Sequence, residues 1–334
     1  MAHPVPAGFS LRPVSLEDAP TIADVINECT IAEIGLPWIT EKEMRDDLTS
    51  PGRDATDLDA LVVDQHGAAA GYLQLWGDIP PYNELFALPS VKSGFWGRGL
   101  SRYLLELAEE RARARIPRAP ETARVVLQAA RFLGNEAAER LFRILGYAPV
   151  RTFFQMRIDL AEPPPAPLEV SGIEIRSFDP AHDAEPAYAA LAEAFQDHWG
   201  HVFPPYEQWR HAHIDGEGAG FDPELWFVAM DRGQVVGAAC CRASTARDPD
   251  AGEVNILGVR RDWRRRGIGL ALLSSAFVRF CERSIRAAEL GVDGENETGA
   301  TRLYRRAGMR TAYGWEVWEK ELRPAGRSEQ EQGG

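Results

Sequence analysis

Short apolar stretches of strand character alternate with longer amphipathic stretches of helical character, and the same succession occurs twice along the chain. In each half, two strand patterns face each other across a short turn; they comprise residues 60–64 with 70–75, and residues 226–230 with 235–241. A glycine-rich turn that leads into an amphipathic helix follows in each half. A further helix then ends at Gly146 in the first half and at Gly308 in the second. We interpret this succession as an internal duplication of one α+β domain.

The segment 161–172, AEPPPAPLEVSG, separates the two halves. Consecutive prolines favour extended polyproline geometry and cannot pair in the centre of a sheet, so the segment is typical of a linker. The sequence therefore predicts a first domain at 1–160 and a second at 173–323. The polar, glycine-rich segment 324–334 is predicted to be a disordered tail.

Composition narrows the possible partners. The chain has 334 residues, 45% of them hydrophobic, and a formal net charge of −13, which disfavours binding to nucleic acid or to an anionic membrane surface. No apolar stretch approaches the roughly 18 residues of a membrane span, and the N-terminus lacks the pattern of a signal peptide. The four cysteines match no disulfide or zinc spacing, so we expect a cytoplasmic protein without a metal site.

A glycine-rich turn in the second half joins a buried strand, at Val254 to Val259, to an amphipathic helix that begins near Gly269. This geometry aims several backbone N–H groups at an anion, and glycine lets a phosphate approach the backbone closely. Arg264, Arg265 and Arg266 add positive charge at the same turn. The turn is therefore a candidate site for a pyrophosphate.

Two common phosphate motifs, GxxxxGK[ST] and GxGxxG within a βαβ unit, are absent. The turn instead fits the pattern [RQ]xxGx[GA], as Arg264-Arg-Arg-Gly267-Ile-Gly269, which resembles the pyrophosphate-binding signature of the GNAT superfamily of acyl-CoA N-acyltransferases. Residues 296–309, NETGATRLYRRAGM, resemble the later motif of that superfamily: an asparagine, a helix that carries Leu-Tyr, and a glycine. The two motifs stand in the usual order and separation.

The resemblance implies two tandem GNAT-like domains of α+β class with a mixed sheet, and a degenerate N-terminal copy. In this arrangement the chain is similar to tandem GNAT proteins with an active C-terminal domain, such as mycothiol synthase. It also implies acetyl-CoA as the acyl donor. The implied cofactor-binding residues are Leu257, Gly258, Val259, Arg264, Arg265, Arg266, Gly267, Ile268, Gly269, Leu270 and Asn296.

Acyl transfer from a thioester to an amine requires a neutral amine, a stabilised oxyanion and a proton for the departing thiolate. The resemblance implies that Tyr304 protonates the thiolate, and that Glu253, at the start of the strand that would bind the thioester, acts as the base. We expect backbone N–H groups around Leu257 to Val259 to stabilise the oxyanion, where the strand splays from its neighbour.

The first half departs from the family pattern in two ways. Its turn, Gly94-Phe-Trp-Gly97-Arg-Gly99, retains the two later glycines but has no arginine or glutamine before them. Phe142 stands where the second half has Tyr304, and phenylalanine has no proton to donate. We therefore expect a single active site, in the second half.

Other polar groups are open to two interpretations. Asp197, His198, Trp199 and Trp209 lie in the early helical region that, by resemblance, lines the acceptor pocket; alternatively they are core aromatics and solvated polar groups. The histidines of this region show no metal-ligand spacing. Four arginines that follow the first glycine turn are expected to form a solvated helix face: Arg111, Arg113, Arg115 and Arg118.

These observations predict an acetyl-CoA-dependent N-acetyltransferase that transfers its acyl group directly, in a ternary complex, to a primary amine of a small molecule. Two alternatives remain open from the residues: an acetyltransferase for protein or peptide N-termini, and a non-catalytic acyl-CoA-binding sensor. The acceptor, the acyl chain length and the oligomeric state are not encoded in these motifs.

Overall fold

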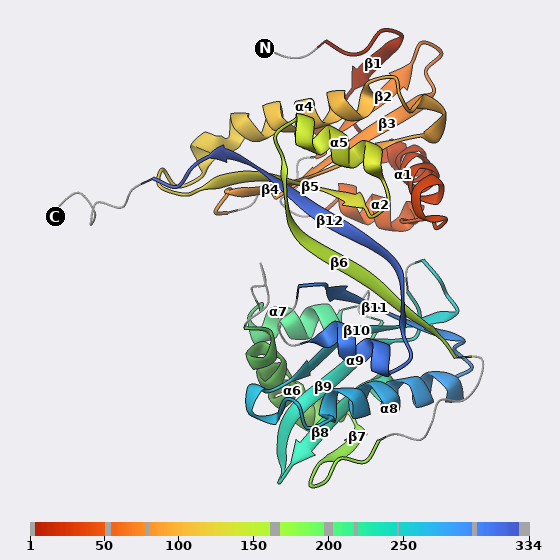
Figure 1. The fold of residues 1–334 in the computed structure, drawn as a ribbon, viewed down its shortest axis with the longest axis vertical. Helices are drawn as coiled ribbons and strands as arrows, with labels where there is room; N and C mark the ends of the chain where they lie inside the picture. The colour runs from red at the N-terminus through yellow and green to blue at the C-terminus, as the bar shows by residue number, and fades with distance from the viewer. Residues whose placement is uncertain are drawn as a thin grey trace, which may run out of the picture. The chain divides into compact units, whose positions relative to one another are not determined.

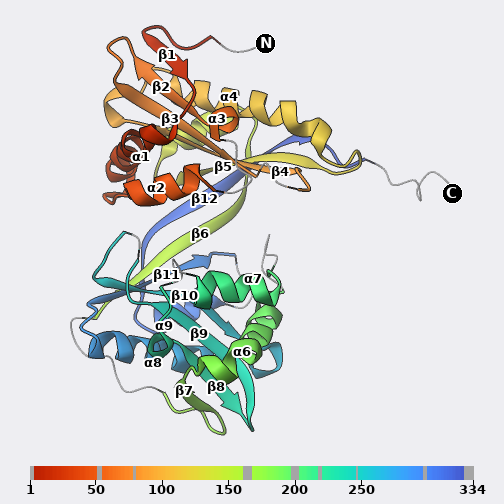
Figure 2. The same ribbon diagram turned by 180° about the vertical axis from the view of Figure 1, so that it is seen from behind.

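The computed structural model describes residues 4–50, 55–77, 80–160, 168–196, 203–216, 220–245, 247–295 and 299–326. The chain forms two compact units: the first contains Met1–Thr152 and Trp315–Gly334, and the second contains Phe153–Gly314. Each unit is a mixed sheet with helices on both faces (Figures 1 and 2), so the predicted α+β class is confirmed. In the described part of the chain, no helix has the length and apolar character needed to cross a bilayer.

The first unit follows the strand–helix order expected from the sequence. Its α-helices are α1 (Ala19–Ile34), α2 (Glu41–Leu48), α3 (Ala55–Leu58), α4 (Leu100–Arg115) and α5 (Glu136–Ile144), and its short 3₁₀ turns are η1 (Leu16–Asp18), η2 (Ser93–Phe95) and η3 (Ile116–Arg118). Its strands are β1 (Phe9–Arg12), β2 (Ala60–Asp64), β3 (Ala69–Trp76), β4 (Glu84–Val91) and β5 (Val125–Phe132).

The sheet of the first unit runs β1-β2-β3-β4-β5, and residues 315–323 of β12 (Arg310–Arg323) pair with the far side of β5. Only β4 and β5 run parallel within this series, because the helix α4 carries the chain back across the sheet. Helices α1 and α2 cover one face of the sheet and α4 and α5 cover the other (Figures 1 and 2). Apolar side chains such as Leu73, Leu104 and Trp318 fill the interior.

The second unit repeats this plan. Its helices are α6 (Pro180–Phe195), α7 (Tyr206–Arg210), the π-helical η4 (His211–Asp215), η5 (Pro223–Leu225), η6 (Arg261–Trp263), α8 (Ile268–Glu282) and α9 (Ala300–Arg306). Its strands are β7 (Glu174–Ser177), β8 (Phe227–Asp231), β9 (Gln234–Arg242), β10 (Ala251–Val259) and β11 (Ala287–Asp293). Helix α6 packs on β9 and β10 from one face, and α8 packs on the same strands from the other.

The last strand of each repeat completes the sheet of the other unit. Strand β6 (Ala148–Asp159) follows the last helix of the first repeat, yet its residues 153–159 pair antiparallel with β11 in the second unit. Conversely, residues 315–323 of β12 follow the last helix of the second repeat and pair antiparallel with β5 in the first unit. Each unit therefore contains a strand that is encoded in the other half of the sequence.

Candidate active site

Strand β10 separates from its parallel neighbour in the middle of the second unit. Its pairing with β11 extends only over Ala251, Gly252 and Glu253. Beyond Glu253, β10 stays paired with β9, but the register shifts between Val254 and Ile256, which is the signature of a β-bulge at Asn255. Beyond Glu253, the edge of β10 on the β11 side is therefore not paired with β11.

The orientation of the backbone at this edge follows from the alternation of an antiparallel ladder. The N–H of Arg260 donates to the carbonyl oxygen of Val236 on the β9 side, at 2.9 Å. Alternate residues must face the other way, so the N–H groups of Leu257 and Val259 and the C=O group of Leu257 point toward the unpaired edge, whereas the Val259 carbonyl oxygen already accepts a hydrogen bond from Arg264. These groups could bind the amides and the thioester oxygen of an acyl-CoA.

The missing side chain of Gly258 allows α6 to pack closely on β10; it has no role at the unpaired edge of β10. A β-carbon at this position would lie 2.8 Å from Leu191 Cδ2 and 3.1 Å from Ala194 Cβ, both on α6. Gly269 is similar, because a β-carbon there would lie 2.9 Å from Leu303 Cδ1 on α9. The glycines therefore let α6 pack closely on β10 and α9 on α8.

The N-terminus of α8 follows directly. Gly267 is its N-cap residue with φ of +89°, and Arg265 also has a positive φ of +64°. The first backbone donor that bonds back to this cap is Ala271, whose N–H reaches the oxygen of Gly267 at 3.0 Å. The N–H groups of Ile268, Gly269 and Leu270 therefore have no acceptor within the helix and are available to an anion.

Two of the three arginines of the turn contact other groups of the protein. The Arg264 guanidinium donates to the carbonyl oxygens of Ala194, at 2.9 Å, and Val259, at 3.2 Å. It therefore ties the turn to α6 and to the end of β10. Arg266 lies 3.6 Å from the carboxylate of Asp231. Because Arg264 bonds to the backbone, it is less available to a phosphate than the predicted cluster of three arginines would require.

Glu253 lies where β10 and β11 part and is partly buried. Burial raises the pKa of its carboxyl group and the neighbouring carboxylate of Glu289 adds to this, while Arg242 and Arg247 act in the opposite direction. The guanidinium of Arg242 is 3.8 Å from the Glu253 carboxylate. A raised pKa makes Glu253 a better proton acceptor than an ordinary surface carboxylate once it is ionised.

A second carboxylate, Glu289, is the parallel-strand neighbour of Glu253 and is only 5% exposed. Arg157 donates to it at 2.5 Å and Gln155 at 3.2 Å. Arg157 also pairs with Asp248 at 2.8 Å. Both donors lie on β6, in the first half of the sequence, so no local pattern could indicate that they support this site.

Tyr304 lies on α9, as the Leu-Tyr motif predicts, and is 8% exposed. Burial raises the pKa of its phenol to about 12. Its hydroxyl makes no hydrogen bond to a residue that the structure describes, so it is free to donate to a ligand. The backbone N–H of Met309 donates to the backbone carbonyl oxygen of Tyr304 at 3.0 Å and closes the helix after Gly308, whose φ is +90°.

The candidate acceptor residues are only partly placed. Trp209 is fully buried and its ring contacts those of Tyr188, Tyr206, His213 and Trp226, so it belongs to an aromatic cluster in the core. Asp197, His198, Trp199 and the candidate cofactor residue Asn296 lie outside the described residues. Across the described ranges, no group of histidine, cysteine or carboxylate side chains is arranged to hold a metal ion.

The β3–β4 ladder of the first unit can be aligned with the β9–β10 ladder of the second, which shows which of these site residues the first unit lacks. Gly71 pairs with Val91 there as Gly237 pairs with Val259 in the second unit. Counting along both ladders places Phe86 where the second unit has Glu253, and Pro89 where it has Leu257. The β3–β4 ladder has no register shift over these residues. The first unit therefore lacks the carboxylate, the bulge and one of the outward N–H groups, because proline has no amide hydrogen.

The structure also corrects the alignment of the two glycine turns. Gly97 and Gly99 have φ of +77° and +84°, and Gly99 is the N-cap residue of α4. Gly99 therefore corresponds to Gly267, not to Gly269 as the sequence comparison predicted. Trp96 then stands for Arg264 and Ser101 for Gly269. The first turn retains only one motif glycine, fewer than the sequence indicated.

Comparisons with known proteins agree with this geometry. The profile of the Acetyltransferase (GNAT) family matches residues 187–309. A mycothiol acetyltransferase from Thermobispora bispora is 31% identical over 245 residues, which cover 72% of this chain and 76% of that protein. The chain belongs to the GNAT family of acetyltransferases. It is therefore an N-acetyltransferase that uses an acyl-CoA donor.

Other similar proteins match this chain over nearly its whole length. A mycothiol acetyltransferase from Streptomyces coelicolor is 28% identical, with 90% of this chain and 93% of that protein covered. The crystal structure of a GCN5-related N-acetyltransferase from Sphaerobacter thermophilus has a TM-score of 0.83 and 36% identity, and covers 97% of this chain and 99% of that one. A tandem GNAT protein from the clavulanic acid biosynthesis pathway, 17% identical with a TM-score of 0.63, shares the fold.

Proposed function

We propose that the second unit transfers an acetyl group from acetyl-CoA to the primary amine of a small molecule, directly and within a ternary complex. The observation that carries this proposal is the unpaired edge of β10, which begins at Glu253, a carboxylate of raised pKa, and presents the N–H groups of Leu257 and Val259. The first unit has Phe86 and Pro89 at the corresponding positions, which supports a single active site.

In the proposed mechanism the pyrophosphate of the donor lies against the N-terminus of α8. The free N–H groups of Ile268, Gly269 and Leu270 bind its oxygens, and the positive end of the helix dipole favours the negative charge. The pantetheine arm then continues along the open edge of β10. This arrangement positions the thioester near Glu253, where the two strands part.

Glu253 acts as the general base in this mechanism, either directly or through a water molecule. An amine nucleophile is mainly protonated at neutral pH, so it must lose a proton before or during attack. The ionised form of Glu253 is the active one. Buried Glu289 raises the pKa of Glu253, whereas the bonds of Arg157 and Gln155 to Glu289 offset that second negative charge.

The tetrahedral intermediate formed by attack carries its negative charge on the former carbonyl oxygen. An outward N–H of β10, from Leu257 or Val259, stabilises this oxyanion without any reorganisation, because the strand already holds it in place. Collapse of the intermediate then expels the CoA thiolate. Tyr304 donates a hydrogen bond to the sulfur as its charge develops.

The acceptor class rests on the named relatives. The two mycothiol acetyltransferases described above are named for a small molecule. A carboxylate base and the nearby Glu289 also suit a cationic amine. We therefore propose a small amine, and not a protein N-terminus, as the substrate of this chain.

The test is a panel of small primary amines assayed with acetyl-CoA, with free thiol release as the signal. Turnover of at least one small amine, lost in Glu253→Gln and Tyr304→Phe, is the expected result. Propionyl-CoA and longer thioesters in the same assay define the acyl length. Acetylation of peptide N-termini but no small amine would contradict the proposed acceptor class, and acetyl-CoA binding without turnover of either class would indicate a sensor.

A further inference from the structure

The arginines on α4 do not form the solvated face that the sequence predicted. Arg113 and Arg118 are exposed, but Arg115 is only 7% exposed and Arg111 is partly buried. The prediction was therefore wrong for Arg111 and Arg115. These two side chains turn toward the sheet side of the helix because α3 and β1 leave room beside it.

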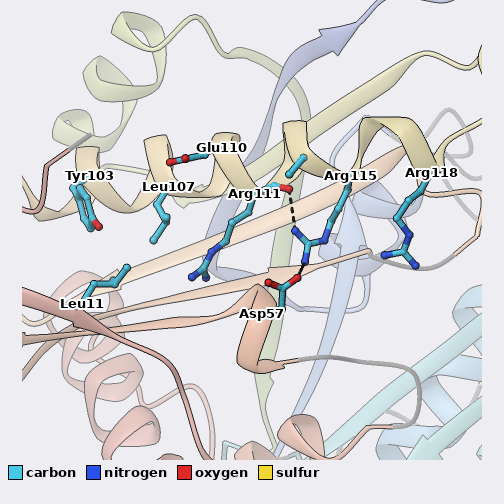
Figure 3. Close-up of a pocket in the computed structure, with 9 residues that line it drawn as sticks. Leu11, Asp57, Tyr103, Leu107, Glu110, Arg111, Arg115 and Arg118 are labelled. Carbon is cyan, nitrogen blue, oxygen red and sulfur yellow. Dashed lines mark hydrogen bonds and ion pairs between the residues drawn. The ribbon is translucent and has the colours of Figure 1, made fainter. Parts of the chain in front are cut away.

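A cavity of about 600 Å³ occupies that room (Figure 3). It is lined by α4, by η3, by β1 and by α3, all in the first unit. None of these elements is β4 or β5, between which a GNAT unit would bind its donor, and the Gly99 turn does not line the cavity. Its volume lies within the range of small-molecule sites in proteins. The cavity is thus separate from the proposed acyl-CoA site.

The three guanidinium groups of the cavity differ in their partners. Arg115 donates to the carbonyl oxygen of Arg111 at 3.0 Å and forms an ion pair with Asp57. The Arg118 guanidinium lies 4.1 Å from the ring centroid of Tyr82. Arg111 makes a single hydrogen bond, from Nη1 to the carbonyl oxygen of Leu58 at 2.6 Å. Among the described residues, no carboxylate forms an ion pair with Arg111.

A partly buried cation without an ion-pair partner is unfavourable, because it has lost part of its hydration. Burial lowers the pKa of the Arg111 guanidinium, while the carboxylates of Asp57 and Asp59, which form no ion pair with it, act in the opposite direction. The Nε and Nη2 groups of Arg111 retain their hydrogens for an acceptor, and a carboxylate matches the planar fork of a guanidinium. The cavity thus offers a binding point for one carboxylate.

The other end of the cavity is apolar. Figure 3 shows Leu11 of β1 opposite Leu107 and Tyr103 of α4, with Arg111 between this end and Arg115. Tyr103 is buried and Leu107 is partly buried. A ligand that bonds to Arg111 would therefore place the rest of its body against apolar side chains, which favours an acid with an apolar body.

We propose that this cavity is a binding site for a small organic monocarboxylate, with the carboxylate on Arg111 and an apolar body between Leu11 and Leu107. The charges of the lining residues favour a single negative charge: three arginines face Asp57 and Glu110, which leaves one excess positive charge. The site lies in the unit that has lost the catalytic groups, so ligand binding there does not depend on acyl transfer.

The probes are acetate, hexanoate, benzoate and inorganic phosphate, titrated calorimetrically into the full-length protein in saturating acetyl-CoA. Benzoate and hexanoate are expected to bind, and hexanoate to bind more tightly than acetate by up to roughly four-fold for each methylene that becomes buried. Arg111→Met should weaken benzoate binding by at least about ten-fold, the usual worth of a charged hydrogen bond. Arg113→Met is the matched control, because Arg113 lies on the same helix, outside the cavity, and should leave binding unchanged.

A crystal of the unaltered protein soaked in 4-iodobenzoate gives a second readout that does not depend on a variant. The iodine is expected between Leu11 and Leu107. The proposal is overturned if no monocarboxylate binds at tens of millimolar, if Arg111→Met leaves binding intact, or if the iodine lies elsewhere. Tighter binding of phosphate than of benzoate would also overturn the assignment of a monocarboxylate.

Discussion

Replacing Tyr304 with phenylalanine removes one hydroxyl group and keeps the ring. The first unit shows that phenylalanine is compatible with this helix position, because Phe142 occupies the corresponding place and packs against Tyr147 and Trp318. The variant should therefore fold normally and bind acetyl-CoA with unchanged affinity. Any loss of turnover then reports on the hydroxyl alone.

The size of the loss follows from the pKa of the phenol. Burial raises that pKa to about 12, whereas a thiol has a pKa near ~8.5, so complete proton transfer to the thiolate is uphill by about 3.5 units, or roughly 5 kcal/mol. Tyr304 should therefore stabilise the leaving thiolate mainly as a hydrogen-bond donor. A hydrogen bond to a charged group contributes about 1.5–3 kcal/mol, so kcat should fall by roughly 10- to 150-fold.

The assay is steady-state thiol release at saturating acetyl-CoA and saturating concentration of the best amine of the panel, with donor affinity measured separately by calorimetry. Unchanged kcat in Tyr304→Phe would refute the role of the hydroxyl. A fall well beyond 10³-fold would refute the hydrogen-bond argument and favour complete proton transfer. Phe142→Tyr in the Tyr304→Phe background should restore nothing, because the first unit also lacks the base and an outward N–H.

Three further predictions concern the base, the donor site and the exchanged strands. In the unaltered protein, the acidic limb of the kcat/KM–pH profile should lie above the ordinary glutamate range, because burial raises the pKa of Glu253. In Glu253→Gln this limb is expected to disappear, and activity should partly recover at high pH. An unchanged profile would exclude Glu253 as the base. Gly267→Val forces a β-branched residue to a φ of +89° and should weaken acetyl-CoA binding by at least about ten-fold. The control Gly99→Val is equally strained, at a φ of +84°, and should leave acetyl-CoA binding unchanged. Equal effects of the two variants would contradict a single donor site. The fragment 168–334 alone should show no cooperative unfolding by circular dichroism, and co-expression with 1–167 should restore it; a stable, active fragment would show that β6 is dispensable.

Local sequence patterns predicted the duplicated strand–helix order, because each repeat has its own hydrophobic periodicity and its own helix-ending glycine. They also predicted the α8 turn and the position of Tyr304 on a helix, since these features depend on neighbours in sequence. The family relationship predicted Glu253, which a lone carboxylate at a strand end would not reveal. The proposed roles of these residues await the assays above.

Features that depend on distant segments could not be predicted. The support of Glu289 by Arg157 joins residues 132 positions apart, on strands that pair only after the repeats exchange them. The alignment of the glycine turns was wrong for a related reason. The sequence motif aligns Gly99 with Gly269, but the backbone shows that Gly99 and Gly267 share the left-handed N-cap conformation. The exposure of Arg111 and Arg115 on α4 was predicted wrongly because α3 and β1, which lie beside them, are far back in the sequence.

The exchange of strands between the repeats has a consequence for how such a gene can evolve. A duplicated domain that no longer catalyses a reaction is normally free to shorten or to be deleted. Here, deletion of residues 1–160 would also remove the strand that pairs with β11 and the arginine bonded to Glu289. With the single active site that we propose, selection on the second half must therefore preserve the reading frame and the folding of the first half. The first half is then free to acquire a second ligand but cannot be lost.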